Sequence, residues 1–220
     1  MYVGIAGVAK KSTPATPYIV GNELVCNGIA RALLLPCPPG ALMDLNAEPY
    51  FFSLDFNLAG QALPPANVQA VVNEQPRLCW GIIAFDVLVL NNDRHNGNFS
   101  YDTQTKALQI FDHSHALLAP NGDNGNVSQR LAGNANGLGI GGHSLAPEID
   151  TFDGMKSWTA RIAGLPNYLI EGLVEEACTV GFPAANRQEI TDFLKSRRDN
   201  IEGLITANTA SFPKLPAGGP

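Results

Sequence analysis

A dense polar loop directly behind a long apolar segment constrains the fold more than any other feature. Residues 80–90 read Trp-Gly-Ile-Ile-Ala-Phe-Asp-Val-Leu-Val-Leu, and residues 91–98 read Asn-Asn-Asp-Arg-His-Asn-Gly-Asn. The apolar segment predicts a buried helix over about residues 77–90, with Trp80 in the core. A buried element that ends in such a loop brings many hydrogen-bonding groups to one place, as active-site loops do.

A second polar cluster, residues 111–115, follows a predicted β-hairpin. Residues 99–101 and 107–111 have the composition of strands, and the polar residues between them that of a turn. Because a hairpin returns the chain to its starting point, Asn98 and Asp112, at its two ends, can both approach Asp93. Three oxygen-bearing side chains suit a hard cation such as Mg²⁺, whose remaining ligands would be phosphate oxygens and water.

The spacing of these residues resembles that of a family of atypical kinases. Asp93 and Asn98 follow the pattern Asp-x-x-x-x-Asn, in which the aspartate accepts a hydroxyl proton and the asparagine binds metal. With Asp112 after the hairpin, the pattern is similar to the catalytic loop and metal-binding aspartate of HipA-like kinases and of phosphatidylinositol kinases. The likeness is sharp over residues 85–115. The histidine follows the aspartate here, whereas ordinary protein kinases place it before.

The resemblance implies an α+β fold of a reduced two-lobed, protein-kinase-like type, with a small N-terminal sheet, one helix and a mainly helical C-terminal lobe. The expected divisions are a truncated N-terminal lobe over residues 1–60, which includes a helix at residues 22–35, and a helical lobe over residues 61–212. The helical lobe would contain a catalytic loop at residues 91–98 and a metal-binding segment at residues 110–115. A disordered tail is expected over residues 213–220.

By the same resemblance, the chain is expected to be a phosphotransferase that uses ATP and Mg²⁺ and acts on a protein serine or threonine. Asp93 would be the catalytic base, and Asn98 and Asp112 would hold the metal. Arg94 and His95 would neutralise transferred charge or brace the loop. The competing hypothesis is an inactive kinase-like module that binds a protein partner or a nucleotide, because no glycine-rich strand pair precedes the expected lysine.

A kinase also needs a lysine that points into the cleft from a strand. Residues 8–11 resemble the Val-Ala-Ile-Lys pattern and favour Lys11, with Lys10 as the alternative, whereas a strand at residues 2–5 would leave no lysine there. A solvated lysine pair is the simpler interpretation. A phosphate-binding P-loop is excluded, because two residues separate Gly7 from the lysines.

Glu23 is the expected partner of the lysine, in the first turn of a helix that Asn22 would cap. As a plain first-turn carboxylate it needs no partner. ATP would therefore be bound by Lys11 or Lys10 together with Glu23, by analogy with the family.

Simpler interpretations of the polar clusters stay open. One is a Gly- and Asn-rich surface turn after a core helix. Another is a metal site of alternating histidines and carboxylates, although no cysteine pair or His-x-x-x-His spacing supports zinc; its members would be Asp93, His95, Asp112, His113 and His115. The glycine-rich residues 119–145 are interpreted either as a mobile substrate-facing loop or as a plain connector.

Composition and charge narrow the class of protein. The chain has 220 residues, of which 45% are hydrophobic and 15% charged, so it can bury a sizeable core. A net charge of -6 argues against contact with nucleic acid and against a basic membrane-binding patch. Membrane insertion is not expected, and the four cysteines lack metal spacing. A cytoplasmic protein with a protein substrate or partner is the expectation.

The rest of the chain has ordinary strand and helix patterns. Strands are expected at residues 41–45 and 50–56, and Arg197 and Arg198 are expected to be solvated. Helices are expected near residues 68–73, 153–163, 167–179 and 185–208.

Overall fold

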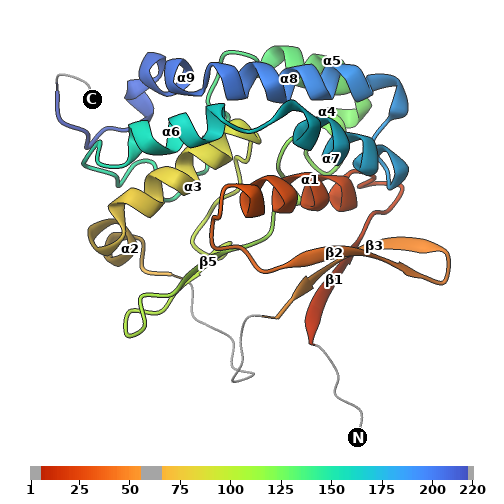
Figure 1. The fold of residues 1–220 in the computed structure, drawn as a ribbon, viewed down its shortest axis with the longest axis horizontal. Coiled ribbons are helices and arrows are strands. Elements are labelled where there is room, and N and C mark those ends of the chain that lie inside the picture. Colours follow the sequence, from red (N-terminus) through yellow and green to blue (C-terminus); the bar gives the residue numbers. More distant parts are fainter. Residues whose placement is uncertain (1–5, 56–65, 218–220) are drawn as a thin grey trace, which may run out of the picture.

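The computed structural model describes residues 6–55 and 66–217 of the chain. A small twisted sheet lies on one side of a larger helical body, and helix α1 (Ile19–Ala32) lies between the two (Figure 1). This is the α+β architecture that the sequence predicts, with the sheet near the N-terminus and helices in most of the remainder.

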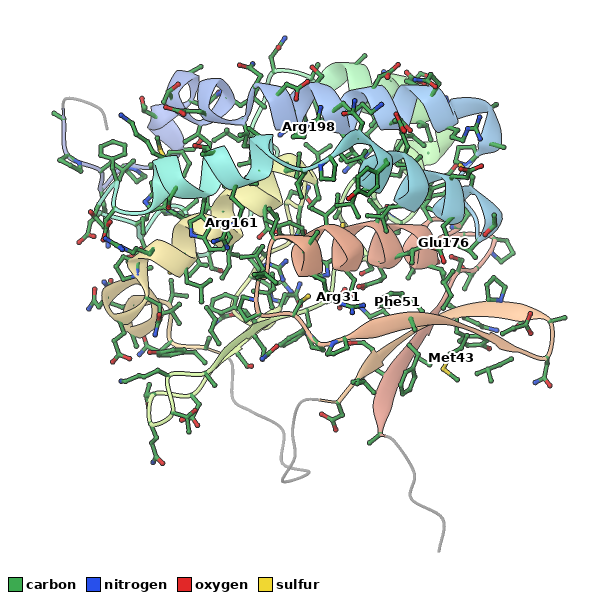
Figure 2. The ribbon with its side chains drawn as sticks, in the orientation of Figure 1. Arg31, Met43, Phe51, Arg161, Glu176 and Arg198 are labelled. Atoms are coloured by element: carbon green, nitrogen blue, oxygen red, sulfur yellow. The ribbon has the colours of Figure 1, made fainter. Side chains whose placement is uncertain are left out.

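The sheet has three antiparallel strands in the order β1-β3-β2, namely β1 (Gly7–Lys11), β2 (Gly40–Leu45) and β3 (Glu48–Leu54). The two strands predicted after the helix are confirmed, whereas the possible strand at residues 2–5 and Phe56 lie outside the described residues. Phe51 is buried toward α1, and Met43 lies on the far side of the sheet (Figure 2). The inner face of the sheet therefore packs on the helix, while its outer face carries partly exposed apolar side chains.

Helix α1 begins three residues earlier than the sequence predicts, so Asn22 is not its cap. Instead, the hydroxyl of Ser12 accepts a hydrogen bond of 3.2 Å from the N–H of Val20. The Asn22 side chain is fully buried and donates to the carbonyls of Ser114 and Ala119, both at 2.9 Å. Asn22, which the sequence predicted as a cap, therefore links the helix to the segment after the hairpin.

The centre of the helical body is α3 (Pro76–Leu88), which is buried without interruption from Cys79 to Leu88. Trp80 is fully buried, as expected of a core residue. The predicted hairpin is confirmed as β4 (Phe99–Tyr101) and β5 (Leu108–Ile110), with Phe99 opposite Ile110. It therefore starts and ends beside the loop that follows α3.

In the part of the chain that the structure describes, seven further α-helices complete the body, and helices α8 and α9 run along its top (Figure 1). The helix predicted over residues 185–208 is broken between α8 and α9. None of the helices in the described part is long and apolar enough to cross a lipid bilayer. The helices are α2 (Val68–Glu74), α4 (Gly122–Gly125), α5 (Val127–Gly133), α6 (Met155–Ala163), α7 (Asn167–Thr179), α8 (Arg187–Asp199) and α9 (Ile201–Ala207).

The prediction that Arg197 and Arg198 are solvated is wrong. Both are buried, and Arg198 lies beneath α8 where it donates to the carbonyl of Leu165 at 2.8 Å (Figure 2). Arg197 donates to backbone carbonyls, two of its nitrogens to that of Val87. Burial lowers the pKa of Arg197 to about 10. Backbone oxygens replace water around this guanidinium, which is why an arginine is tolerated there.

In the described part of the predicted disordered tail, residues 213–217, only Leu215 is partly buried and the other four residues are exposed. Leu215 lies against the core, and Lys214 forms an ion pair with Glu148. Residues 218–220 lie outside the described residues.

Candidate active site

Lys10 is the lysine that faces the interior of the molecule. Its Nζ lies 2.6 Å from Glu23 Oε1 and 2.7 Å from Asp112 Oδ1. In the β1–β3 register Lys10 is opposite the buried Phe51, so alternation of side chains directs Lys11 to the outer face. Lys11, which the sequence favoured, pairs at 3.2 Å with the exposed Glu48. The ion pairs of Lys10 thus join strand β1, helix α1 and the segment after β5.

Glu23 is almost completely buried in the second turn of α1, not in the first turn as predicted. Its Oε1 accepts the N–H of His113 at 3.0 Å in addition to the Lys10 ammonium. Burial alone would raise the pKa of Glu23, but hydrogen bonding to His113 and the charge of Lys10 outweigh it and lower the pKa. Glu23 is therefore held as a carboxylate with two partners.

Asp112 adopts a left-handed backbone conformation with φ +58°, which aspartate tolerates better than most residues. Its Oδ1 accepts the Ser114 hydroxyl at 2.6 Å and also contacts Lys10. Although burial opposes ionisation, the Lys10 charge, the hydrogen bond from Lys10 and those from Ser114 lower the pKa of Asp112 to about 2. The carboxylate is therefore ionised at neutral pH.

The loop after α3 brings Asp93 and Asn98 together. The Asn98 side-chain amide donates to the Asp93 carbonyl at 2.7 Å and to Asp93 Oδ2 at 3.3 Å. Asn98 also lies beside the segment that carries Asp112, because its carbonyl accepts the N–H of Phe111 at 3.1 Å. The Asp93 side chain is partly exposed and the His95 side chain exposed, with His95 Nδ1 accepting the N–H of Gly97 at 3.0 Å.

Arg94 is fully buried behind this loop and points away from solvent. Its Nε and Nη2 donate to Asp86 at 2.9 and 3.0 Å, and its Nη1 donates to the carbonyls of Asn98 and Phe111, both at 2.7 Å. The guanidinium is committed to these partners, so the predicted role of neutralising transferred charge does not fit this position. Bracing the loop, the other predicted role, does.

Sequence reasoning missed two members of this buried network, Asp86 and His143. Burial would raise the pKa of Asp86, but the Arg94 charge, the nearby His143 ring and the hydrogen bonds from Arg94 hold it well below its usual range. A single carboxylate inside an apolar helix was a signal, because buried charges need partners. His143, which comes from the glycine-rich segment, carried no such signal.

The alternative site of histidines and carboxylates is not assembled. Strand β5 ends at Ile110, so His113 and His115 do not alternate along it, and His113 is buried against Phe85 while His115 is exposed. Within residues 6–55 and 66–217, no group of three or more His, Cys, Asp or Glu side chains could hold a metal ion.

The donor set of Asn98 and Asp112 nevertheless fits Mg²⁺. Asn98 donates through its amide nitrogen, and Asp112 accepts through Oδ1. Among the residues that the structure describes, none donates a hydrogen bond to Asn98 Oδ1 or to Asp112 Oδ2. One amide and one carboxylate oxygen therefore remain for a hard cation, which takes its other ligands from phosphate and water.

Comparison with known proteins identifies a solved structure with a similar fold. No protein-family model matches the chain, and no curated protein matches its sequence. Among solved structures, the chain is similar to a crystal structure of the Helicobacter pylori proinflammatory kinase CtkA, with a TM-score of 0.59 and 16% identity over 96% of this chain and 89% of that one. At this identity the likeness concerns the fold. The chain has a kinase-like α+β fold, with a small N-terminal sheet and a mostly helical remainder.

Proposed function

We propose that the chain is a phosphotransferase that uses ATP and Mg²⁺ and transfers a phosphoryl group to an alcohol, namely a serine or threonine of a protein. One observation carries the proposal: Lys10 contacts both Glu23 and Asp112, at 2.6 and 2.7 Å, although the three residues come from separate parts of the chain. A lysine that pairs with a helix glutamate beside a metal-binding aspartate is the arrangement that positions ATP in kinases. The kinase-like fold supports the same interpretation.

The candidate residues would have distinct roles. Lys10, oriented by Glu23, would bind phosphate oxygens of ATP, and Asn98 and Asp112 would hold Mg²⁺. When bound, the metal would neutralise charge on the phosphates. The Asp93 carboxylate would accept the proton of the acceptor hydroxyl while the hydroxyl oxygen bonds to the γ-phosphorus and ADP leaves. His95, exposed on the same loop, could contact the transferred group.

The second candidate function is an inactive module that binds a nucleotide or a protein. It is favoured by the described sheet, in which the three strands include no glycine-rich pair over Lys10. Such a protein would keep the lysine contacts and bind ATP without transferring phosphate.

Incubation with γ-labelled ATP, Mg²⁺ and an array of serine- and threonine-containing peptides tests the proposal. We expect Asp93→Asn and Asp112→Asn each to lower label transfer by about 10²–10⁴-fold. Asp192→Asn, a matched change at an exposed position of α8, should leave it unchanged. Transfer that survives both site changes would contradict the proposal, and ATP binding by the wild type without transfer would favour the inactive module.

A further inference from the structure

The buried network behind the candidate site is completed by His143, from the glycine-rich segment. The Nδ1 of His143 accepts the N–H groups of Leu145 and Ala146 at 3.0 and 3.2 Å, so the ring proton is on Nε2. That Nε2 lies 3.1 Å from Asp86 Oδ2 without forming a directed hydrogen bond, so the contact between the ring and the carboxylate is electrostatic. Both side chains are fully buried, so water does not compete for this contact.

Asp86 relays the contact to Arg94. The Asp86 carboxylate accepts hydrogen bonds from two nitrogens of Arg94 and from the side-chain amide of Asn91, the last at 2.8 Å. Arg94 Nη1 then bridges the carbonyls of Asn98 and Phe111. Phe111 directly precedes Asp112, so a single nitrogen ties together the two backbone segments that carry the candidate metal ligands.

The glycine-rich segment also packs directly on the loop after α3. The N–H of Ser144 donates to the Arg94 carbonyl at 2.9 Å. A Cβ on Gly142 would lie 2.5 Å from the carbonyl oxygen of Asn92, so only glycine allows this close approach. At these positions the segment is bound to the loop that carries Asp93, which argues against the predicted mobile substrate-facing loop there.

We infer that His143 is a positioning residue of the candidate active site, which acts through Asp86 and Arg94 to fix the separation of Asn98 and Asp112. The consequence for metal binding rests on the proposed function. The consequence for the free protein does not, because the chain of contacts from His143 to Phe111 is complete without a ligand. A defect in bracing can therefore be measured without ATP.

Two substitutions separate bracing from general stability. In His143→Asn, the shorter side chain can still accept the N–H groups of the turn through its oxygen but does not reach Asp86; in His143→Gln, the amide nitrogen can take the place of Nε2. The matched control is Ile149→Ala, which truncates a fully buried side chain four residues after the glycine-rich segment and outside the network.

The first readout is amide hydrogen exchange of the full chain without nucleotide. We expect His143→Asn to speed exchange in residues 91–99 and 108–114 by about tenfold, because the contact of His143 with the buried Asp86 carboxylate is lost, and His143→Gln to restore protection. Ile149→Ala should spare both stretches. Equal exchange in the Asn variant and the control would overturn the inference.

The second readout is the Mg²⁺ concentration needed for half-maximal ATP binding, measured by calorimetry. We expect His143→Asn to raise it about tenfold, as second-layer changes at metal sites do, with His143→Gln close to wild type. An unchanged value in the Asn variant would overturn the role in metal binding. A wild type that binds no ATP at any Mg²⁺ concentration would defeat the proposed function instead, and hydrogen exchange would still decide the bracing.

If the Asn variant does not fold, amide hydrogen exchange of the wild type tests the inference. The amides of Ser144 and Phe111 should then open in one step, with the same opening free energy, because each is hydrogen-bonded to a backbone carbonyl that the network holds. Independent opening of the two amides would overturn the inference.

Discussion

Two ionic clusters flank the segment around Asp112, and they differ in their access to water. The cluster of Lys10, Glu23 and Asp112 has side chains that are 25%, 4% and 37% exposed. The cluster of Asp86, Arg94 and His143 is 0% exposed throughout. The first joins the sheet to the helical body, and the second lies within the body. A ligand can therefore exchange partners with the first cluster, whereas the second is a fixed support.

The difference follows from electrostatics. In a dry interior, a hydrogen-bonded ion pair is strong once formed, and removing one member leaves an uncompensated buried charge. Partly exposed charges are screened by water and salt, so they can change partners with little loss of free energy. A site that binds a charged ligand needs both properties, namely exchangeable charges on a support that does not move.

The largest expected effect concerns the stability of the buried cluster. We expect Asp86→Ala to lower the free energy of unfolding by about 3–5 kcal/mol, because Arg94 is left buried without its counter-charge. Lys10→Met should lower it by only about 1 kcal/mol, because Glu23 keeps the N–H of His113. Urea unfolding followed by circular dichroism measures both. Equal losses in the two variants would remove the distinction between the clusters.

A smaller effect should appear on acidification. The pKa of Asp112 is about 2 in the folded protein and about 3.9 in an unfolded chain, so its stabilising contribution is present above pH 4 and is lost as the pH falls toward 2. After allowance for solvent screening, we expect a loss of about 1 kcal/mol. Urea unfolding at pH 6 and pH 3 should show a smaller difference in Asp112→Asn than in the wild type. An identical difference in both proteins would place the acid sensitivity elsewhere.

The sequence predicted the elements around the site better than the side-chain directions within it. The hairpin and the buried helix were evident from local composition. The sequence pattern favoured Lys11, whereas Lys10 faces inward, because a shift of one residue in strand register exchanges the two faces of a strand. That register is set by pairing with β3, which lies far along the chain.

Three other features were predicted wrongly or not at all, for different reasons. The start of α1 depends on the hydroxyl of Ser12, which lies outside the helix and was not recognised as a cap. Arg197 follows Ile190 and Leu194 at helical spacing, so its buried position could have been read from periodicity. His143 could not have been found this way, because its contacts with Asp86 depend on how the glycine-rich segment packs.

The most direct test of the candidate site uses an acyl-phosphate derivative of ATP, which transfers its acyl group to the amine of a lysine beside the bound phosphates. Mass spectrometry of the peptide that contains Lys10 and Lys11 then identifies which neighbour is modified. We expect acylation of Lys10 that requires Mg²⁺, is blocked by excess ATP and is lost in Asp112→Asn, with Lys11 unmodified. Acylation of Lys11 instead, or labelling of Lys10 that ATP does not suppress, would contradict the proposed role of Lys10.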